Sequence, residues 1–287
     1  MSLETIRAWG DRGVYRPREL EPPSQAAGPW RLGGVAAVPD TVLEAGRVGG
    51  LEVRAVSTRG SAHRFDGVVR QDAVAVSEVD ERWVLAAVAD GVGGAADAHS
   101  GAQLAVRHAL DHLAQSLRDS ESADLVGALR AADRAVRGAG PAPGDRSTTL
   151  TVATVESAGE AGPERRYRVA RVGDSPGFLL TDGAFLPLFG SGDRARAGAV
   201  WDAATDCLPS PSGPAERAEG VLRTGQALVL TSDGIGVPLQ DTPAGPYLAR
   251  AWAEPPGPVA FLHQLQFDLR SYDDDRTAAV VWAWDEP

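Results

Sequence analysis

The stretch WVLAAVADGVGG, residues Trp83–Gly94, decides the fold of this chain. Its first seven residues are apolar, and the run stops at Asp90, which Gly91 follows at once. A short apolar run with such an end is typical of a strand that is buried on both faces. Aspartate is disfavoured inside strands and costly to bury without a partner, so Asp90 either caps a turn or belongs to a site.

Aspartates stand at the ends of other apolar runs as well. Asp174 ends RVARVGD, Asp233 ends QALVLTSD, and Asp274 shortly precedes TAAVVWAW. Asp72 stands just before AVAV. Any one of them alone reads as a turn or cap residue. Strand ends can converge at one edge of a sheet sandwich, however, and five carboxylates together there would repel one another strongly without a cation.

An oxygen-only ligand set points to a particular class of metal. Carboxylates, a backbone carbonyl and water suit Mg²⁺ or Mn²⁺ and offer nothing to a soft metal. Gly91 has no side chain, so its carbonyl can approach a cation closely. Two such ions that share an aspartate and a water molecule can activate that water and polarise a phosphoryl oxygen. The sequence therefore predicts a divalent metal site at the strand ends.

The rest of the chain alternates strands and helices. The predicted strands are Leu51–Val56, Ala73–Val76, Trp83–Ala89, Thr148–Val155, Tyr167–Val172, Phe178–Thr181, Phe185–Leu188, Ala227–Thr231 and Thr277–Trp284. Asp182-Gly183 lies between two of these runs and is a strong hairpin signal. Apolar residues at i, i+4 and i+7 predict helices over Val106–Leu117 and Leu125–Val136, and a third is expected over Pro258–Ser271. This order predicts an α+β domain in which helices cover antiparallel sheets.

The composition narrows the class of protein. The chain has 287 residues and a formal net charge of −11 with a pI near 4.9, which disfavours nucleic acid and anionic membranes as partners. It lacks both a run of about 18 apolar residues and the apolar core of a signal peptide, so we expect a cytoplasmic protein. Residues 1–50 read as a Pro/Gly-rich extension, and residues 51–287 as the folded domain.

Six short elements follow one another along the chain. They are Gln71-Asp72-Ala73, Asp90-Gly91-Val92-Gly93-Gly94, Ser147-Thr148-Thr149-Leu150, Val172-Gly173-Asp174-Ser175, Thr231-Ser232-Asp233-Gly234 and Asp274-Asp275-Arg276-Thr277. In order, spacing and strand-end placement they resemble the metal-dependent protein phosphatases of type 2C, and bacterial members in particular. The resemblance runs from about Leu51 to Trp284.

The resemblance implies a fold and an activity. The fold is an αββα sandwich of two antiparallel β-sheets flanked by antiparallel helix pairs. The activity is hydrolysis of phosphoserine and phosphothreonine esters by a metal-activated water, with two to three Mn²⁺ or Mg²⁺ ions and no covalent intermediate. Residues 51–287 would then be the catalytic domain, and its partner a phosphorylated protein, so that the enzyme counteracts a Ser/Thr kinase.

The resemblance also assigns roles to individual residues. The metal ligands would be Asp72, Asp90, Gly91, Asp174, Asp233 and Asp274. Asp90 would bridge two ions, and with Asp233 and Asp274 it forms the catalytic set. The Gly91 carbonyl would bind the second ion, and Asp174 with Asp233 would hold a third. Gln71 replaces the carboxylate that the family has before Asp72.

Several positions depart from the family pattern. Many members grip the phosphate with an arginine where this chain has Gly67, so Arg64 and Arg70 are the candidates to replace it. His63 is not such a departure: it belongs to a G-x-x-H stretch, Gly60 to His63, that resembles a subgroup of bacterial members, and it is a candidate phosphate ligand or general acid, with a structural role as the alternative. Asp275 stands where asparagine is usual, and its charge either compensates for a lost one or faces solvent.

These departures leave a second function open. Gln71, Gly67 and Pro176 each depart from the pattern at a functional position, and Val92 replaces the histidine of eukaryotic members. The alternative is a catalytically weak, phosphatase-like regulatory module that binds a phosphorylated partner. The segment between Leu188 and Leu222 is the region expected to contact the substrate.

Overall fold

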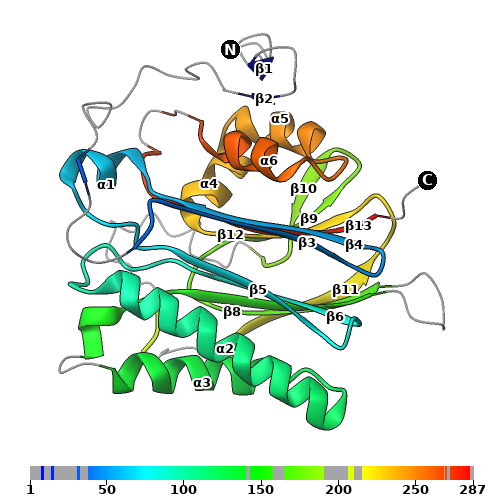
Figure 1. Cartoon of the computed structure of the whole chain (residues 1–287), viewed down its shortest axis with the longest axis horizontal. Helices are drawn as coiled ribbons and strands as arrows, with labels where there is room; N and C mark the ends of the chain where they lie inside the picture. Colours follow the sequence, from blue (N-terminus) through cyan, green and yellow to red (C-terminus); the bar gives the residue numbers. More distant parts are fainter. Residues whose placement is uncertain are drawn as a thin grey trace.

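The apolar runs form two antiparallel sheets that pack face to face between layers of helices (Figure 1). The computed structural model describes residues 8–9, 14–15, 31–32, 38–139, 143–157, 165–190, 206–209, 215–267, 269 and 272–284. The strands are β1 (Ala8–Trp9), β2 (Val14–Tyr15), β3 (Thr41–Val48), β4 (Leu51–Thr58), β5 (Ala73–Val79), β6 (Trp83–Ala89), β7 (Leu150–Glu156), β8 (Arg165–Val172), β9 (Gly177–Thr181), β10 (Ala184–Pro187), β11 (Glu216–Leu222), β12 (Ala227–Thr231) and β13 (Arg276–Ala283). The helices are α1 (Ser61–Asp66), α2 (Ala98–Ser120), α3 (Leu125–Gly138), α4 (Asp233–Asp241), α5 (Ala244–Ala251) and α6 (Pro258–Leu265), with a 3-10 helix over Pro143–Arg146.

The two sheets have simple antiparallel orders. The six-stranded sheet runs β10-β9-β12-β13-β4-β3, and the five-stranded sheet runs β11-β8-β7-β6-β5. Helices α2 and α3 cover the outer face of the five-stranded sheet, and α4, α5 and α6 lie over the outer face of the six-stranded one (Figure 1). The predicted αββα sandwich is confirmed, with a helix pair on one side and three shorter helices on the other.

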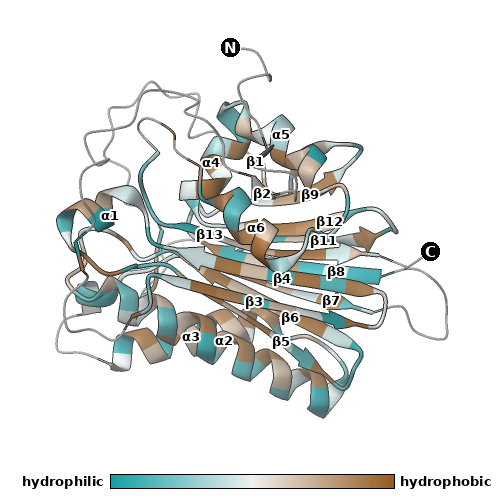
Figure 2. Ribbon diagram, turned by 45° about the horizontal axis from the view of Figure 1, so that its top comes forward, coloured by the Kyte–Doolittle hydropathy of each residue, from teal (hydrophilic) through white to brown (hydrophobic). Residues whose placement is uncertain are grey.

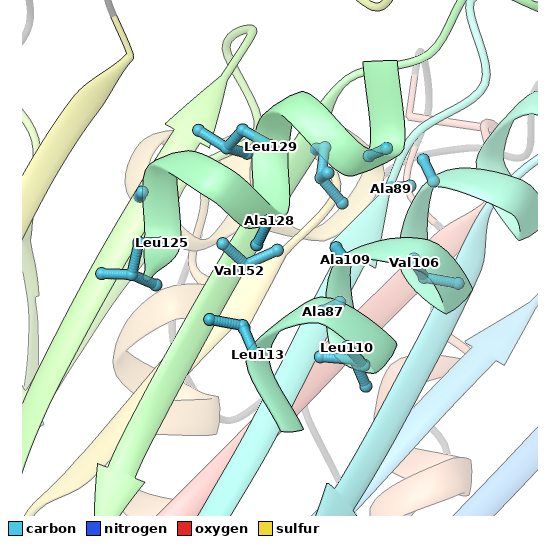
Figure 3. Packing of buried hydrophobic residues seen from close by; sticks show 14 of the residues in the cluster. Ala87, Ala89, Val106, Ala109, Leu110, Leu113, Leu125, Ala128, Leu129 and Val152 are labelled. Atoms are coloured by element: carbon cyan, nitrogen blue, oxygen red, sulfur yellow. The ribbon is translucent and has the colours of Figure 1, made fainter. Parts of the chain in front are cut away.

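Buried side chains fill each interface between layers. Leu110, Leu113 and Leu129 of α2 and α3 lie over Ala87 of β6 and Val152 of β7 (Figure 3). Hydrophobic and hydrophilic residues alternate along both helices, as expected for helices with one buried face (Figure 2). Fully burying one such leucine contributes roughly 1.5–3 kcal/mol, so these layers hold the sheet ends in fixed positions.

The two-residue hairpin predicted at Asp182-Gly183 is confirmed. Thr181 of β9 pairs with Ala184 of β10. Asp182 and Gly183 have φ of +50° and +72°, as a type I′ turn requires at both central positions.

The folded domain begins before residue 51, where the sequence predicted its start. Thr41–Val48 belongs to the sandwich as the edge strand β3, and it pairs with β4 from Thr41–Thr58 to Val48–Leu51. Several of its side chains are exposed, so its apolar pattern is weak. The Gly49-Gly50 turn that joins it to β4, with Gly49 at φ +54°, was the available signal.

Other elements also differ from expectation. The edge strand β11 was missed because its sequence ERAEGVL carries exposed charged residues and only its last residue is buried. Helices α1, α4 and α5 were missed because each has nine residues or fewer, which is too short to show a helical period. Helix α6 ends at Leu265, earlier than the predicted Ser271, which itself lies outside the described residues.

Candidate metal centre

The strand-end aspartates come together where ends of both sheets meet. Ala73 of β5 pairs with Ala89 of β6, so Asp72 and Asp90 lie side by side at the ends of neighbouring strands. The Thr277 hydroxyl of β13, in the other sheet, donates to Asp72 Oδ2 at 2.6 Å. The Asp233 backbone N–H approaches Asp90 Oδ2 at 3.5 Å. Residues that are far apart in the sequence therefore meet across the sandwich.

The cluster is buried at its base and open at its rim. Asp72 is buried, Asp90 is half-buried, and Asp174, Asp233 and Asp274 are exposed. Asp174 lies between β8 and β9, near enough for its charge to act on Asp233. All five predicted carboxylates thus contribute to one cluster that ions and water can reach.

Burial and repulsion raise the pKa of the inner carboxyls. Desolvation raises the pKa of Asp90 well above 3.8, and the charges of Asp72, Asp233 and Asp274 raise it further. Desolvation also raises the pKa of Asp72 well above 3.8, with the charge of Asp275 adding to it and the Thr277 hydrogen bond opposing it. A bound cation would reverse these shifts, because it favours the charged form.

Two further observations fit a hard divalent cation. A Cβ at Gly91 would lie 2.8 Å from the Gln71 carbonyl oxygen and 2.9 Å from Ala98 Cβ, so only glycine lets the backbone come this close. The Gln71 side-chain Oε1 is buried and has no hydrogen-bond partner among the described residues. Such an acceptor is costly to leave unpaired. The oxygen-only donor set and this orphaned oxygen fit Mg²⁺ or Mn²⁺.

Two threonines, Thr148 and Thr149, hold the backbone of Asp90, a role that was not predicted from the sequence. Thr148 Oγ1 donates to the Asp90 carbonyl at 2.8 Å, and the Asp90 N–H donates to Thr149 Oγ1 at 3.1 Å. The Thr149 N–H also donates to the Asp90 carbonyl at 2.8 Å. The Ser147–Leu150 element was the available signal, because it stood among the six ordered motifs.

Asp275 does not face solvent. Its side chain is 1% exposed and accepts hydrogen bonds from the backbone of Gly60, Gln71 and Asp72 and from His63 Nδ1. Burial raises the pKa of the Asp275 carboxyl, but the hydrogen bond and charge of His63 outweigh it and lower that pKa below 3.8. His63 therefore has the structural role that was its alternative, because it is the hydrogen-bond partner of a buried carboxylate.

The Arg64 guanidinium is engaged by neighbouring side chains of the framework. Its guanidinium donates to the Asp40 carboxylate at 2.6 and 3.2 Å and to Thr58 Oγ1 at 3.1 Å. The residue is buried. These contacts tie α1 to the segment that precedes β3.

Arg70 is buried as well. It donates to Ser57 Oγ at 2.5 Å, to the Asp72 carbonyl at 2.6 Å and to the Pro39 carbonyl at 3.2 Å. Arg70 thus supports the backbone of Asp72. The structure brings neither arginine to the open rim of the cluster, because both guanidinium groups are engaged by the framework around it.

Part of the expected substrate-contacting segment is not described. Residues 191–205 and 210–214, within Leu188–Leu222, lie outside the described residues. The described remainder includes Leu208, whose backbone pairs with Thr148 beside the cluster.

Comparison with known proteins identifies the class to which this fold and site belong. The family model described as Protein phosphatase 2C matches residues 59–266. The chain therefore belongs to the protein phosphatase 2C family, and the predicted resemblance is confirmed. A search of curated protein sequences finds no match.

Solved structures show the same fold at low sequence identity. The PPM Ser-Thr phosphatase MsPP from Mycobacterium smegmatis, in complex with cacodylate, is 21% identical over 80% of this chain and 97% of its own, with a TM-score of 0.56. The catalytic domain of the phosphatase PstP, in complex with two manganese ions, is 23% identical over 82% and 99%, with a TM-score of 0.54. A structure of the PP2C phosphatase domain of SpoIIE from Bacillus subtilis together with a fragment of its regulatory domain is 16% identical over 84% of this chain and 69% of its own, with a TM-score of 0.54.

A helix that crosses a bilayer requires a certain length and apolar character. None of the described helices is both long enough and apolar enough to span one.

Proposed function

We propose that this chain is a cytoplasmic, metal-dependent phosphoprotein phosphatase that hydrolyses phosphoserine and phosphothreonine esters. The observation that carries the proposal is the convergence of Asp72, Asp90, Asp233 and Asp274 at the sheet ends, where burial and mutual repulsion raise the pKa of the inner carboxyls. Membership of the protein phosphatase 2C family supports it. The manganese ions named for PstP support the choice of metal.

Each residue of the cluster has a proposed role. Asp90, Asp233 and Asp274 would hold one ion. Asp90, the Gly91 carbonyl and Asp72 would hold a second, and Asp174 with Asp233 would hold a third. When bound, the ions supply an activated water and a Lewis acid for the phosphoryl oxygens.

The surrounding chain keeps these ligands in place. The Thr277 hydroxyl orients the Asp72 carboxylate, and Thr148 and Thr149 fix the backbone of Asp90. The Asp275 N–H donates to Asp274 Oδ1 at 2.7 Å and orients that ligand. Ligands held in this way need little rearrangement when a substrate binds.

The test is phosphate release with a matched ligand variant. Wild-type protein with Mn²⁺ should release phosphate from phosphothreonine and phosphoserine peptides, and chelation should abolish the release. Asp233→Asn should reduce the rate by about 100-fold or more, because a metal supplies several kcal/mol and each 1.36 kcal/mol is a factor of ten. The proposal would be refuted if wild-type protein with Mn²⁺ released no more phosphate than Asp233→Asn.

The hydrogen bonds that occupy Arg64 and Arg70 favour the alternative function, a phosphatase-like module with weak catalysis. With Gly67 at the usual arginine position and both neighbouring guanidinium groups occupied, a phosphate grip is not evident among these residues. A catalytically weak module that binds a phosphorylated partner would fit this arrangement. Calorimetry distinguishes the two functions: phosphopeptide binding without Mn²⁺ binding or turnover favours the module, and Mn²⁺ binding with turnover favours the enzyme.

A further inference from the structure

The first turn of α1 packs directly on the loop that carries Asp274. A Cβ at Gly60 would lie 2.3 Å from the Asp274 carbonyl carbon and 2.4 Å from the Asp273 carbonyl oxygen, so the two backbones are in contact. The Ala62 N–H donates to the Asp273 carbonyl at 3.0 Å. A shift of α1 would therefore move the backbone of Asp274, a predicted metal ligand.

The Asp275 carboxylate lies at the centre of this contact. Its Oδ1 accepts from the Gly60 N–H at 2.7 Å and from His63 Nδ1 at 2.9 Å. Its Oδ2 accepts from the Gln71 N–H at 2.5 Å and from the Asp72 N–H at 3.3 Å. One buried side chain thus joins α1, the segment before β5 and the loop before β13.

These partners require a group that only accepts hydrogen bonds. Backbone N–H groups can only donate, and they face both oxygens of Asp275. An asparagine at this position would turn its NH₂ group toward one of the two pairs, and buried donors would be left unpaired. The position therefore demands a carboxylate rather than the amide that resembles it in shape.

A buried carboxylate also needs a counter-charge or a strong donor. His63 supplies it: its Nδ1 is 2.9 Å from Asp275 Oδ1 and must carry a hydrogen, because the carboxylate can only accept. The same nitrogen lies 3.9 Å from Asp274 Oδ1. The histidine at position 63 thus accounts for the carboxylate at position 275, where the family usually has asparagine.

We propose that Asp275 and His63 form a positioning pair that sets the geometry of the metal centre. The pair acts on one side through the backbone of Gln71 and Asp72, and on the other through Asp274, whose carboxylate accepts from the Asp275 N–H at 2.7 Å. This inference rests on the proposed metal site. It adds two residues that act through the ligands without touching substrate.

The test is the Mn²⁺ affinity of the intact protein, measured by calorimetry on Asp275→Asn. We expect an affinity about 10–100-fold below that of wild type, the usual effect of removing a partner that orients a metal ligand. Asp273→Asn is the matched control: it removes the same charge two residues away, and no hydrogen bond of its carboxylate is found within the described part of the chain. It should stay within about twofold of wild type, since only screened charge is lost.

Kinetics provide a second readout. The Mn²⁺ concentration for half-maximal phosphate release should rise in Asp275→Asn, while the rate at saturating Mn²⁺ stays near that of wild type. A lower rate at saturation with unchanged Mn²⁺ affinity would overturn the inference, because it would point to a direct catalytic role.

His63 variants keep the inference testable if Asp275→Asn fails to fold. His63→Ala should weaken Mn²⁺ binding about tenfold or more, and His63→Asn, which retains an N–H near the Nδ1 position, should recover most of the loss. Equal Mn²⁺ affinity in wild type, His63→Ala and Asp275→Asn would overturn the inference alone. Wild-type protein that binds no Mn²⁺ would refute the proposed function, and this inference with it.

Discussion

Replacing Asp90 with asparagine should change the stability of the protein in opposite directions with and without metal. Burial and three neighbouring carboxylates raise the pKa of Asp90 in the folded state above 3.8. When the pKa of a carboxyl is higher in the folded than in the unfolded state, the folded state loses stability as the pH rises from the unfolded-state pKa to the folded-state pKa. Asparagine carries no charge, so metal-free Asp90→Asn should be more stable than wild type at neutral pH.

The size of this effect follows from the pKa. Each pH unit between the ordinary and the raised pKa costs the wild type about 1.4 kcal/mol, and at pH 7 the ceiling is about 4 kcal/mol. A gain of 1 kcal/mol raises the melting temperature of a chain of this size by roughly 2–4 °C. In chelator, Asp90→Asn should therefore melt above wild type, by at most roughly 8–16 °C.

Metal should reverse the order of stabilities. A ligand at 100 times its dissociation constant stabilises the folded state by about 2.7 kcal/mol, or roughly 5–11 °C for wild type. Asp90→Asn lacks the carboxylate that we propose as a metal ligand and should gain little. The assay is a thermal melt of both proteins with chelator and with Mn²⁺. Asp111→Asn, on an exposed face of α2, controls for the lost charge. Equal melting temperatures of wild type with and without Mn²⁺ would refute the reasoning.

Three further predictions follow from the described contacts. Leu113→Ala, at a fully buried position of α2, should cost about 2–5 kcal/mol in urea unfolding, because it leaves a cavity against the five-stranded sheet. Gly91→Ala should lower Mn²⁺ affinity in calorimetry, since its Cβ would lie 2.8 Å from the Gln71 carbonyl oxygen and push the backbone away. Arg64→Met should lower the melting temperature and leave the KM for a phosphopeptide unchanged, because the buried Arg64 guanidinium donates to Asp40 and Thr58; a raised KM with an unchanged melt would contradict this.

Strands that are buried on both faces could be predicted from the sequence, but two of the four edge strands of the large sheets, β3 and β11, could not. The run Trp83–Ala89 stays apolar because β6 has a neighbour on each side and packing on each face. Edge strands β3 and β11 carry exposed charged residues, so their patterns resemble loops. For β3 a turn signal was present at Gly49-Gly50, and β11 had no equivalent.

The convergence of the aspartates could be predicted for the same reason, because strand ends are visible in the sequence and aspartate is conspicuous there. The contacts that support this cluster could not be predicted from the sequence. His63 and Asp275 are 212 positions apart, and their contact depends on how α1 packs against the loop before β13. The roles of Arg64 and Arg70 likewise depend on Asp40 and on the Pro39 carbonyl, which fell within the expected extension.

The central claim is that the strand-end carboxylates form a divalent metal centre. The most direct measurement is anomalous scattering from crystals grown with Mn²⁺. The account predicts peaks between Asp90, Asp233 and Asp274 and beside the Gly91 carbonyl, with oxygen ligands at about 2.1 Å. Crystals that hold Mn²⁺ elsewhere or not at all, with no peak at Asp90, would contradict it.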